Sequence, residues 1–149
     1  MNIGEFCNRE VAIITAHESV LAAAKVMRQQ HVGDVVVVEH KGGLTIPIGI
    51  LTDRDIVLEV IAKDVSLDAV STGDIMSRDL LLAKETDAVP NIVNQMRTKG
   101  VRRVPVVNEQ GGLEGIFSLD DLLELLTEQL NDFVSVIHKE TNREQRLRP

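Results

Sequence analysis

Apolar residues recur with two different periods along the chain, and the two periods alternate in a fixed order. Residues 20–30 place apolar side chains at the i, i+3, i+4, i+7 spacing of an amphipathic helix. Short apolar runs at 35–38 and 46–51 follow it, and a second helical stretch begins at Thr52. An extended apolar segment, residues 11–14, precedes the first helix. The pattern therefore predicts a β-α-β-β-α unit.

The same order of elements occurs a second time in the chain. Residues 19–39 align with residues 88–108 at a constant offset of 69, so that Met27 falls on Met96. After a Gly-Gly pair in each copy the offset becomes 66, because the first copy is three residues longer there. The sequence thus predicts an α/β (α+β) fold of two tandem repeats, packed with pseudo-twofold symmetry, with helices flanking small sheets. We expect the repeats to span 1–70 and 71–138, followed by a frayed polar tail, 139–149.

Local signals refine this prediction. Ser19 is expected to cap the first helix, and Thr86 or Asp87 to cap its counterpart. The Gly-Gly pairs mark hairpin turns. Residues 80–82 are expected to form the lead-in strand of the second copy. Pro105 removes a backbone donor, so its strand is expected at a sheet edge or to be irregular there.

Composition narrows the function classes. Hydrophobic residues make up 44% of the chain, enough for a core, but aromatic residues only 2%, which argues against base-stacking platforms. The net charge of −7 disfavours nucleic acid and anionic membranes as partners. With the single cysteine Cys7 and no apolar run of membrane length, we expect a cytoplasmic protein. No catalytic constellation and no metal-ligand spacing is evident among Cys7, His17, His31, His40 and His138.

Two related motifs stand where the second helix of each copy begins: "GILTDRD" at 49–55 and "GIFSLDD" at 115–121. One interpretation is a capping box, in which the hydroxyl and the acid bond backbone N–H groups of the first turn. The other is a ligand site. A helix N-terminus and a hydroxyl suit a phosphate, and a carboxylate one turn on suits the two hydroxyls of a ribose. In this interpretation the glycine lets the ligand approach the strand.

The two copies together resemble the cystathionine-β-synthase-type (CBS) domain pair, or Bateman module. The resemblance is carried by "VRRVPVV" before the second hairpin, by the two motifs above, and by "TGDIM" at 72–76. It covers about residues 7–130. It implies a regulatory rather than catalytic module that binds an adenosine compound, such as AMP, ADP, ATP or sometimes S-adenosylmethionine, between the copies and pairs into disk-like dimers. No catalytic cofactor is implied.

Carried over to this chain, the resemblance implies that Thr52 and Ser118 contact phosphate and that Asp55 and Asp121 contact ribose. The two sites differ in charge, because Arg54 of the first motif corresponds to an acid, Asp120, in the second. We therefore expect nucleotide mainly at the first motif. Other candidates are two arginines that could reach phosphates or form a solvated rim, and apolar residues that could line an adenine slot: Arg102, Arg103, Ile14, Val35, Val104, Pro105 and Ile116.

The expected function is a nucleotide-sensing module that signals to a separate, unknown effector protein, because no stretch of this chain is left for an effector domain. The alternative is a structural or protein-interaction module whose motifs serve only as helix caps. The helix from about 119 and residues 56–61 carry apolar stripes wider than one contact needs. We therefore also expect a homodimer in which these helices pack against a second copy; the alternative is a helix buried within the monomer.

Overall fold

The structure, a computed structural model, describes residues 1–148. The chain divides into two compact units, Met1–Phe117 and Ser118–Pro149. The first unit contains nearly all of both sheets, and the second begins with the last residue of a strand and continues as one long helix. The candidate ligand chemistry of the first motif thus lies within the first unit.

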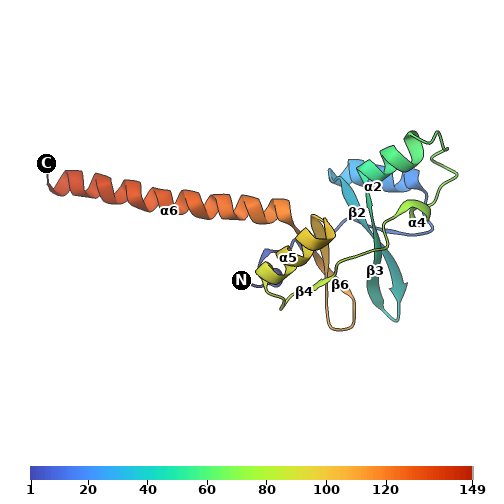
Figure 1. Cartoon of the computed structure of the whole chain (residues 1–149), viewed down its shortest axis with the longest axis horizontal. Coiled ribbons are helices and arrows are strands. Elements are labelled where there is room, and N and C mark those ends of the chain that lie inside the picture. Colours follow the sequence, from blue (N-terminus) through green and yellow to red (C-terminus); the bar gives the residue numbers. More distant parts are fainter. Residues whose placement is uncertain (149) are drawn as a thin grey trace. The chain divides into compact units, whose positions relative to one another are not determined.

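The first copy folds into a three-stranded sheet in the order β1-β2-β3, with one helix between the first two strands (Figure 1). β1 runs parallel to β2, and β2 pairs antiparallel with β3 through a turn in which Gly42 and Gly43 both have positive φ. Such a turn matches the twist of the two strands and favours glycine. The elements are β1 (Ile13–Thr15), α2 (Val20–Gln30), β2 (Asp34–Lys41) and β3 (Leu44–Thr52).

The second copy repeats this arrangement in the order β4-β5-β6, with β4 parallel to β5. The predicted pair of β-α-β-β-α units is confirmed. Its elements are β4 (Ala83–Lys84), α5 (Val89–Lys99), β5 (Arg103–Val107) and β6 (Leu113–Ser118). The remaining elements are α1 (Ile3–Phe6), α3 (Asp53–Ile56), the π-helix η1 (Val57–Ile61), α4 (Thr72–Ile75) and α6 (Leu119–Leu147).

Aliphatic side chains form the core of the first copy. The helix α2 turns Ala23 and Met27 onto the sheet, where they meet Val35, Val37 and Leu51. Ser19 caps α2 as predicted, since its hydroxyl accepts a hydrogen bond of 3.1 Å from the N–H of residue 22. Burial of each large aliphatic side chain stabilises the fold by about 1.5–3 kcal/mol.

The two copies exchange their N-terminal segments. In the first copy, Asn8 pairs with Ile116 of β6; in the second, Ser77 pairs with Ile50 of β3. These pairs are related by the internal repeat, and so are the short helices that precede them: α1 lies against β4, and α4 lies against β3 (Figure 1). Each copy therefore adds its N-terminal segment to the sheet of the other, which fixes the two copies to each other.

Three local predictions were wrong. The lead-in strand of the second copy is Ala83–Lys84 rather than 80–82. Its helix α5 is capped by Ala88, with no side-chain hydrogen bond, while Asp87 accepts a hydrogen bond from the N–H of Lys84 instead. The strand that holds Pro105 is the central strand of its sheet, so of the two alternatives for Pro105 the edge position was wrong.

The predicted frayed tail also differs from the structure, because residues 139–147 continue α6 without a break. Their i, i+4 hydrogen bonds need no buried partner, so a polar sequence can extend an existing helix. None of the helices in the described residues is long and apolar enough to cross a bilayer.

Candidate ligand-binding cleft

A cleft of about 410 Å³ lies within the first unit, where the end of β3 meets two segments of the second copy. Its volume is in the usual range for small-molecule sites, about 300–1,000 Å³. The first copy supplies Ile50, Thr52, Arg54 and Asp55, and the second copy supplies 77–81 and 100–103. The exchange of N-terminal segments builds the cleft. Ser77 pairs with Ile50 of β3, and this pairing brings residues 77–81 of the second copy alongside β3.

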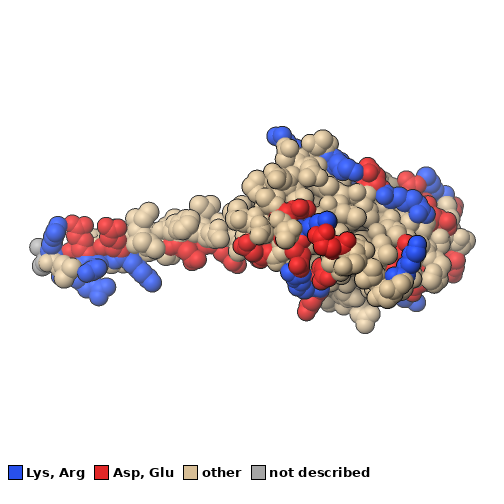
Figure 2. All heavy atoms as spheres, turned by 90° about the horizontal axis from the view of Figure 1, so that it is seen from below, with Lys and Arg blue, Asp and Glu red and all other residues tan. Residues whose placement is uncertain are grey.

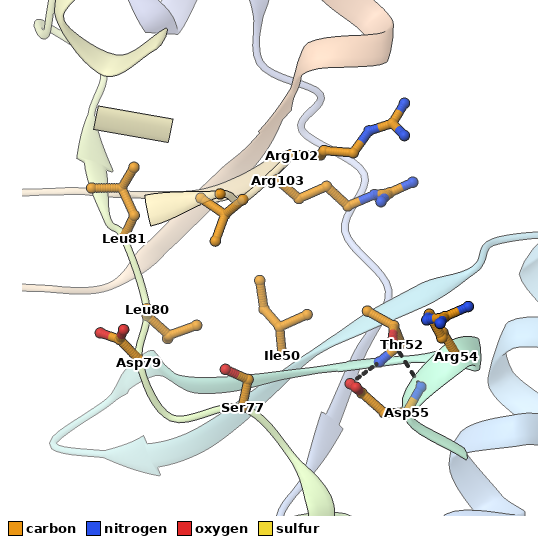
Figure 3. Close-up of a pocket in the computed structure, with 12 residues that line it drawn as sticks. Ile50, Thr52, Arg54, Asp55, Ser77, Asp79, Leu80, Leu81, Arg102 and Arg103 are labelled. Atoms are coloured by element: carbon orange, nitrogen blue, oxygen red, sulfur yellow. Dashed lines mark hydrogen bonds between the residues drawn. The ribbon is translucent and has the colours of Figure 1, made fainter. Parts of the chain in front are cut away.

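Thr52 and Asp55 form a complete capping box at the start of α3. The Asp55 N–H donates to Thr52 Oγ1 (3.1 Å), and the Thr52 N–H donates to Asp55 Oδ2 (2.9 Å). The box holds both side chains in fixed positions at the cleft, as Figure 3 shows. The Thr52 hydroxyl keeps its own proton to donate, and the carboxylate keeps further acceptor sites. The capping and ligand-binding interpretations are therefore compatible in this motif.

Three arginines give the cleft a cationic side. Arg54 comes from α3, and Arg102 and Arg103 come from the start of β5. Figure 3 shows all three on the side of the Thr52–Asp55 box. Arg103 also forms an ion pair with Asp34, the residue at its own equivalent position in the first copy. The pseudo-twofold axis of the repeat thus passes close to a salt bridge beside the cleft.

The opposite side of the cleft is apolar. Figure 3 shows Leu80 and Leu81 across from the arginines, with Ile50 between the two sides. Asp79 lies at this end, and Lys99 neutralises it through an ion pair of 2.7 Å. A flat apolar group therefore fits at one end and an anionic group at the other.

Gly49 faces the protein rather than the cleft. A Cβ at this position would lie 2.5 Å from Met76 Sδ and 2.9 Å from the carbonyl oxygen of Ser77. Its equivalent Gly115 meets the carbonyl oxygen of Asn8 at 2.8 Å. The glycines of both motifs thus allow the exchanged segments to approach the strands, and the expectation that they admit a ligand was wrong.

Only some of the remaining predicted site residues line the cleft. Arg102 and Arg103 line the cleft together with the first motif. The residues expected to form an adenine slot do not line it: four are buried and one pairs with Asn8, namely Ile14, Val35, Val104, Pro105 and Ile116. The apolar side is built instead from Ile50, Leu80, Leu81 and Val101, which the sequence analysis did not identify.

The second motif lies at the start of the second unit. The Ser118 hydroxyl accepts a hydrogen bond of 3.1 Å from the Asp121 N–H and so caps α6. The acid Asp120 occupies the position that Arg54 holds in the first motif. This motif therefore offers the hydroxyl and the carboxylate without the cation.

Other reactive groups lie outside the cleft. Cys7 is half-buried beside α1, and burial raises the pKa of its thiol. The thiol is thus protonated at neutral pH, a poor state for a nucleophile. Within residues 1–148, no three His, Cys, Asp or Glu side chains come together as metal ligands.

Comparison with known proteins agrees with this duplicated architecture. The family model described as "CBS domain" matches residues 3–62 and again 73–128. The chain belongs to the CBS domain family. The two matches correspond to the two copies, so the chain contains a CBS pair, as its resemblance implied.

Relatives and solved structures extend the comparison. Protein MK0525 of Methanopyrus kandleri is 35% identical over 84% of this chain, which spans 62% of that protein's length. Hypoxic Response Protein I, solved with two coordinated zinc ions, is 27% identical, with a TM-score of 0.70 over 83% of this chain and 98% of its own. The CBS pair of MJ0100, solved with 5′-methylthioadenosine and S-adenosyl-L-methionine, is 21% identical, with a TM-score of 0.75 over 87% and 98%. This last likeness shows the fold.

Proposed function

We propose that this CBS pair binds an adenosine nucleotide of the AMP, ADP or ATP class in the cleft and regulates a separate partner protein. The observation that supports the proposal is the cleft itself. It brings an apolar side, a hydroxyl–carboxylate pair and three arginines into one hollow. These are the three kinds of group that a base, a ribose and a phosphate require.

The ribose belongs beside the Thr52–Asp55 box. An ionised carboxylate accepts hydrogen bonds from both hydroxyls of a ribose, and such charge-assisted bonds are worth about 1.5–3 kcal/mol. Adenine then lies against Ile50, Leu80 and Leu81, and the phosphate extends toward the arginines and the Thr52 hydroxyl. Each part of the nucleotide meets a group of matching chemistry.

The three arginines of the cleft favour a ligand that carries a phosphate over one that does not. The protein MJ0100, which has this fold, was solved with adenosine compounds that carry no phosphate. In this chain Arg54, Arg102 and Arg103 line the cleft, and a guanidinium binds phosphate oxygens through paired N–H donors. We therefore expect phosphorylated adenosine to bind more tightly than adenosine, 5′-methylthioadenosine or S-adenosylmethionine.

Regulation follows from the position of Arg103. It joins the two copies through its ion pair with Asp34 and also lines the cleft. A bound phosphate competes with Asp34 for the same guanidinium, so ligand binding changes how the copies are held together. A partner protein that contacts both copies would sense this change. Such a role needs no catalytic group in the cleft.

A thermal-shift panel tests the proposal. A ligand that binds only the folded state at 100 times its Kd stabilises that state by about 2.7 kcal/mol, which raises the Tm by several degrees. AMP, ADP and ATP are expected to raise the Tm more than adenosine, 5′-methylthioadenosine and S-adenosylmethionine. If no member of the panel moves the Tm at saturating concentration, the proposal fails, and a structural or protein-interaction module is the better account.

A further inference from the structure

One face of α6 carries apolar side chains at a regular spacing. Leu123, Leu126, Leu130, Phe133 and Ile137 follow one another at alternating intervals of three and four residues. This is the heptad spacing of the a and d positions that pack against another helix in coiled coils. We call these five residues the heptad stripe. Leu122, which lies outside the stripe, is the buried residue of α6.

The heptad stripe is exposed to solvent. The exposed fractions of its members range from 37% at Leu126 to 66% at Phe133. Val134 and Val136 beside it are exposed as well, at 49% and 64%. Exposed apolar side chains in a continuous row mark an interaction surface. The stripe therefore marks a surface of α6 that is suited to packing against another helix.

Charges are segregated along the same helix. Residues 119–132 contain five acids and no Lys or Arg, whereas residues 133–148 contain four bases and two acids. Figure 2 shows Lys and Arg side chains only toward the C-terminal end of α6. The first half thus carries a net charge of −5 and the second half +2. A partner helix that complements both halves has the reverse order of charge.

The α6 helix of a second copy, in antiparallel orientation, has this reversed order of charge. It places the acidic half of each helix beside the basic half of the other. The a and d positions then form the layers Leu126–Ile137 and Leu130–Phe133, each occurring twice around the twofold axis. Four apolar layers result from one short stripe.

Parallel pairing of the same helices is unfavourable. It sets the acidic half of one copy along the acidic half of the other. It also places Glu140 and Glu144, the next d and a positions, against their own counterparts in the seam. Like charges in direct contact are destabilising, and a half-buried carboxylate pair more so. In the antiparallel arrangement these glutamates lie at the ends of the seam.

We infer that α6 forms an antiparallel coiled coil with α6 of a second copy of this chain. This inference specifies the residues and the direction of pairing, and it does not depend on the ligand proposed for the cleft. A dimer held by the exposed residues of η1, Val57 and Ile61, is the competing arrangement.

The first experiment measures the mass of the full chain by light scattering. The wild type is expected to be a dimer. Leu130→Asp places a charge in the central layers and is expected to raise the dimer dissociation constant at least tenfold. Ser135→Asp is the matched control on the opposite face of α6 and is expected to leave the mass unchanged. A monomeric wild type, or a dimer that survives Leu130→Asp, overturns the inference.

The second experiment determines the direction of pairing by disulfide formation. In a Cys7→Ser background, Leu126→Cys and Ile137→Cys are made as separate chains and oxidised alone or mixed. The antiparallel arrangement predicts a crosslinked dimer only in the mixture, because each new cysteine faces the other position. A crosslink in Leu126→Cys alone means parallel pairing and overturns the inference. Circular dichroism of each variant verifies that the fold is retained.

Discussion

At the scale of single residues, the Thr52–Asp55 box caps α3 and lines the cleft, so the ligand role proposed for it must be separated from its role as a cap. The chain also contains a matched box outside this cleft: the Asp74 N–H donates to Ser71 Oγ (3.2 Å) and the Ser71 N–H to Asp74 Oδ2 (3.0 Å). These hydrogen bonds lower the pKa of Asp74, because they favour its ionised form. Comparison of AMP binding after substitution of Asp55 and of Asp74 separates the loss of a helix cap from the loss of a ligand contact.

Asp34 is the residue expected to oppose phosphate binding, since it pairs with Arg103 beside the cleft. Asp34→Asn removes the competing carboxylate and is expected to raise AMP affinity roughly threefold to tenfold, which corresponds to about 1 kcal/mol. Adenosine affinity is expected to stay constant. Calorimetric titration of both ligands measures the effect. Equal gains for adenosine and AMP would contradict competition for the phosphate.

At the scale of elements, the order of helices and strands was predictable because helical and strand periodicities are local signals. The lengths of the strands were not. In the first copy the Val36 N–H donates to the Ala12 carbonyl, but the equivalent of Val36 is Pro105, which has no N–H. β4 accordingly begins one residue later than β1 does in its copy, although β5 remains the central strand.

The polar half of the cleft was predictable and the apolar half was not. Thr52, Asp55 and Arg54 belong to one motif whose spacing is visible in the sequence. Leu80 and Leu81 reach the cleft because Ser77 pairs with Ile50 of the other copy. Such a pairing between distant segments has no periodic signal. The one hint was a glycine in each return strand, which marks a close approach of backbone.

The exchanged segments lead to a prediction for Gly49. Gly49→Ala is expected to lower the free energy of unfolding by about 1–3 kcal/mol, because the new methyl group overlaps Met76 and the Ser77 carbonyl. Gly33→Ala is the control, since its methyl group meets only the exposed carboxylate of Asp53 at 3.1 Å. Urea unfolding at neutral pH measures both variants. Equal stabilities of the two variants would mean that the close approach at Gly49 carries no constraint.

At the scale of the whole molecule, duplication supplies two copies of one architecture, and substitution has made them chemically different. The first motif has Arg54 and lies in a cleft with Arg102 and Arg103. The second motif has Asp120 instead, and the first copy has Gly33 and Asp34 where the second has the two arginines. The charge difference supports one nucleotide site rather than two equal sites.

The most direct test of this account is a calorimetric AMP titration of the wild type, Asp55→Asn, Asp121→Asn and Asp74→Asn. Asp55→Asn is expected to weaken AMP binding roughly 10- to 100-fold, because it removes a charged acceptor worth about 1.5–3 kcal/mol. Asp74→Asn weakens an equivalent helix cap outside the cleft, and both it and Asp121→Asn are expected to retain wild-type affinity. Equal losses from Asp55→Asn and Asp121→Asn, or none from either, would contradict the account.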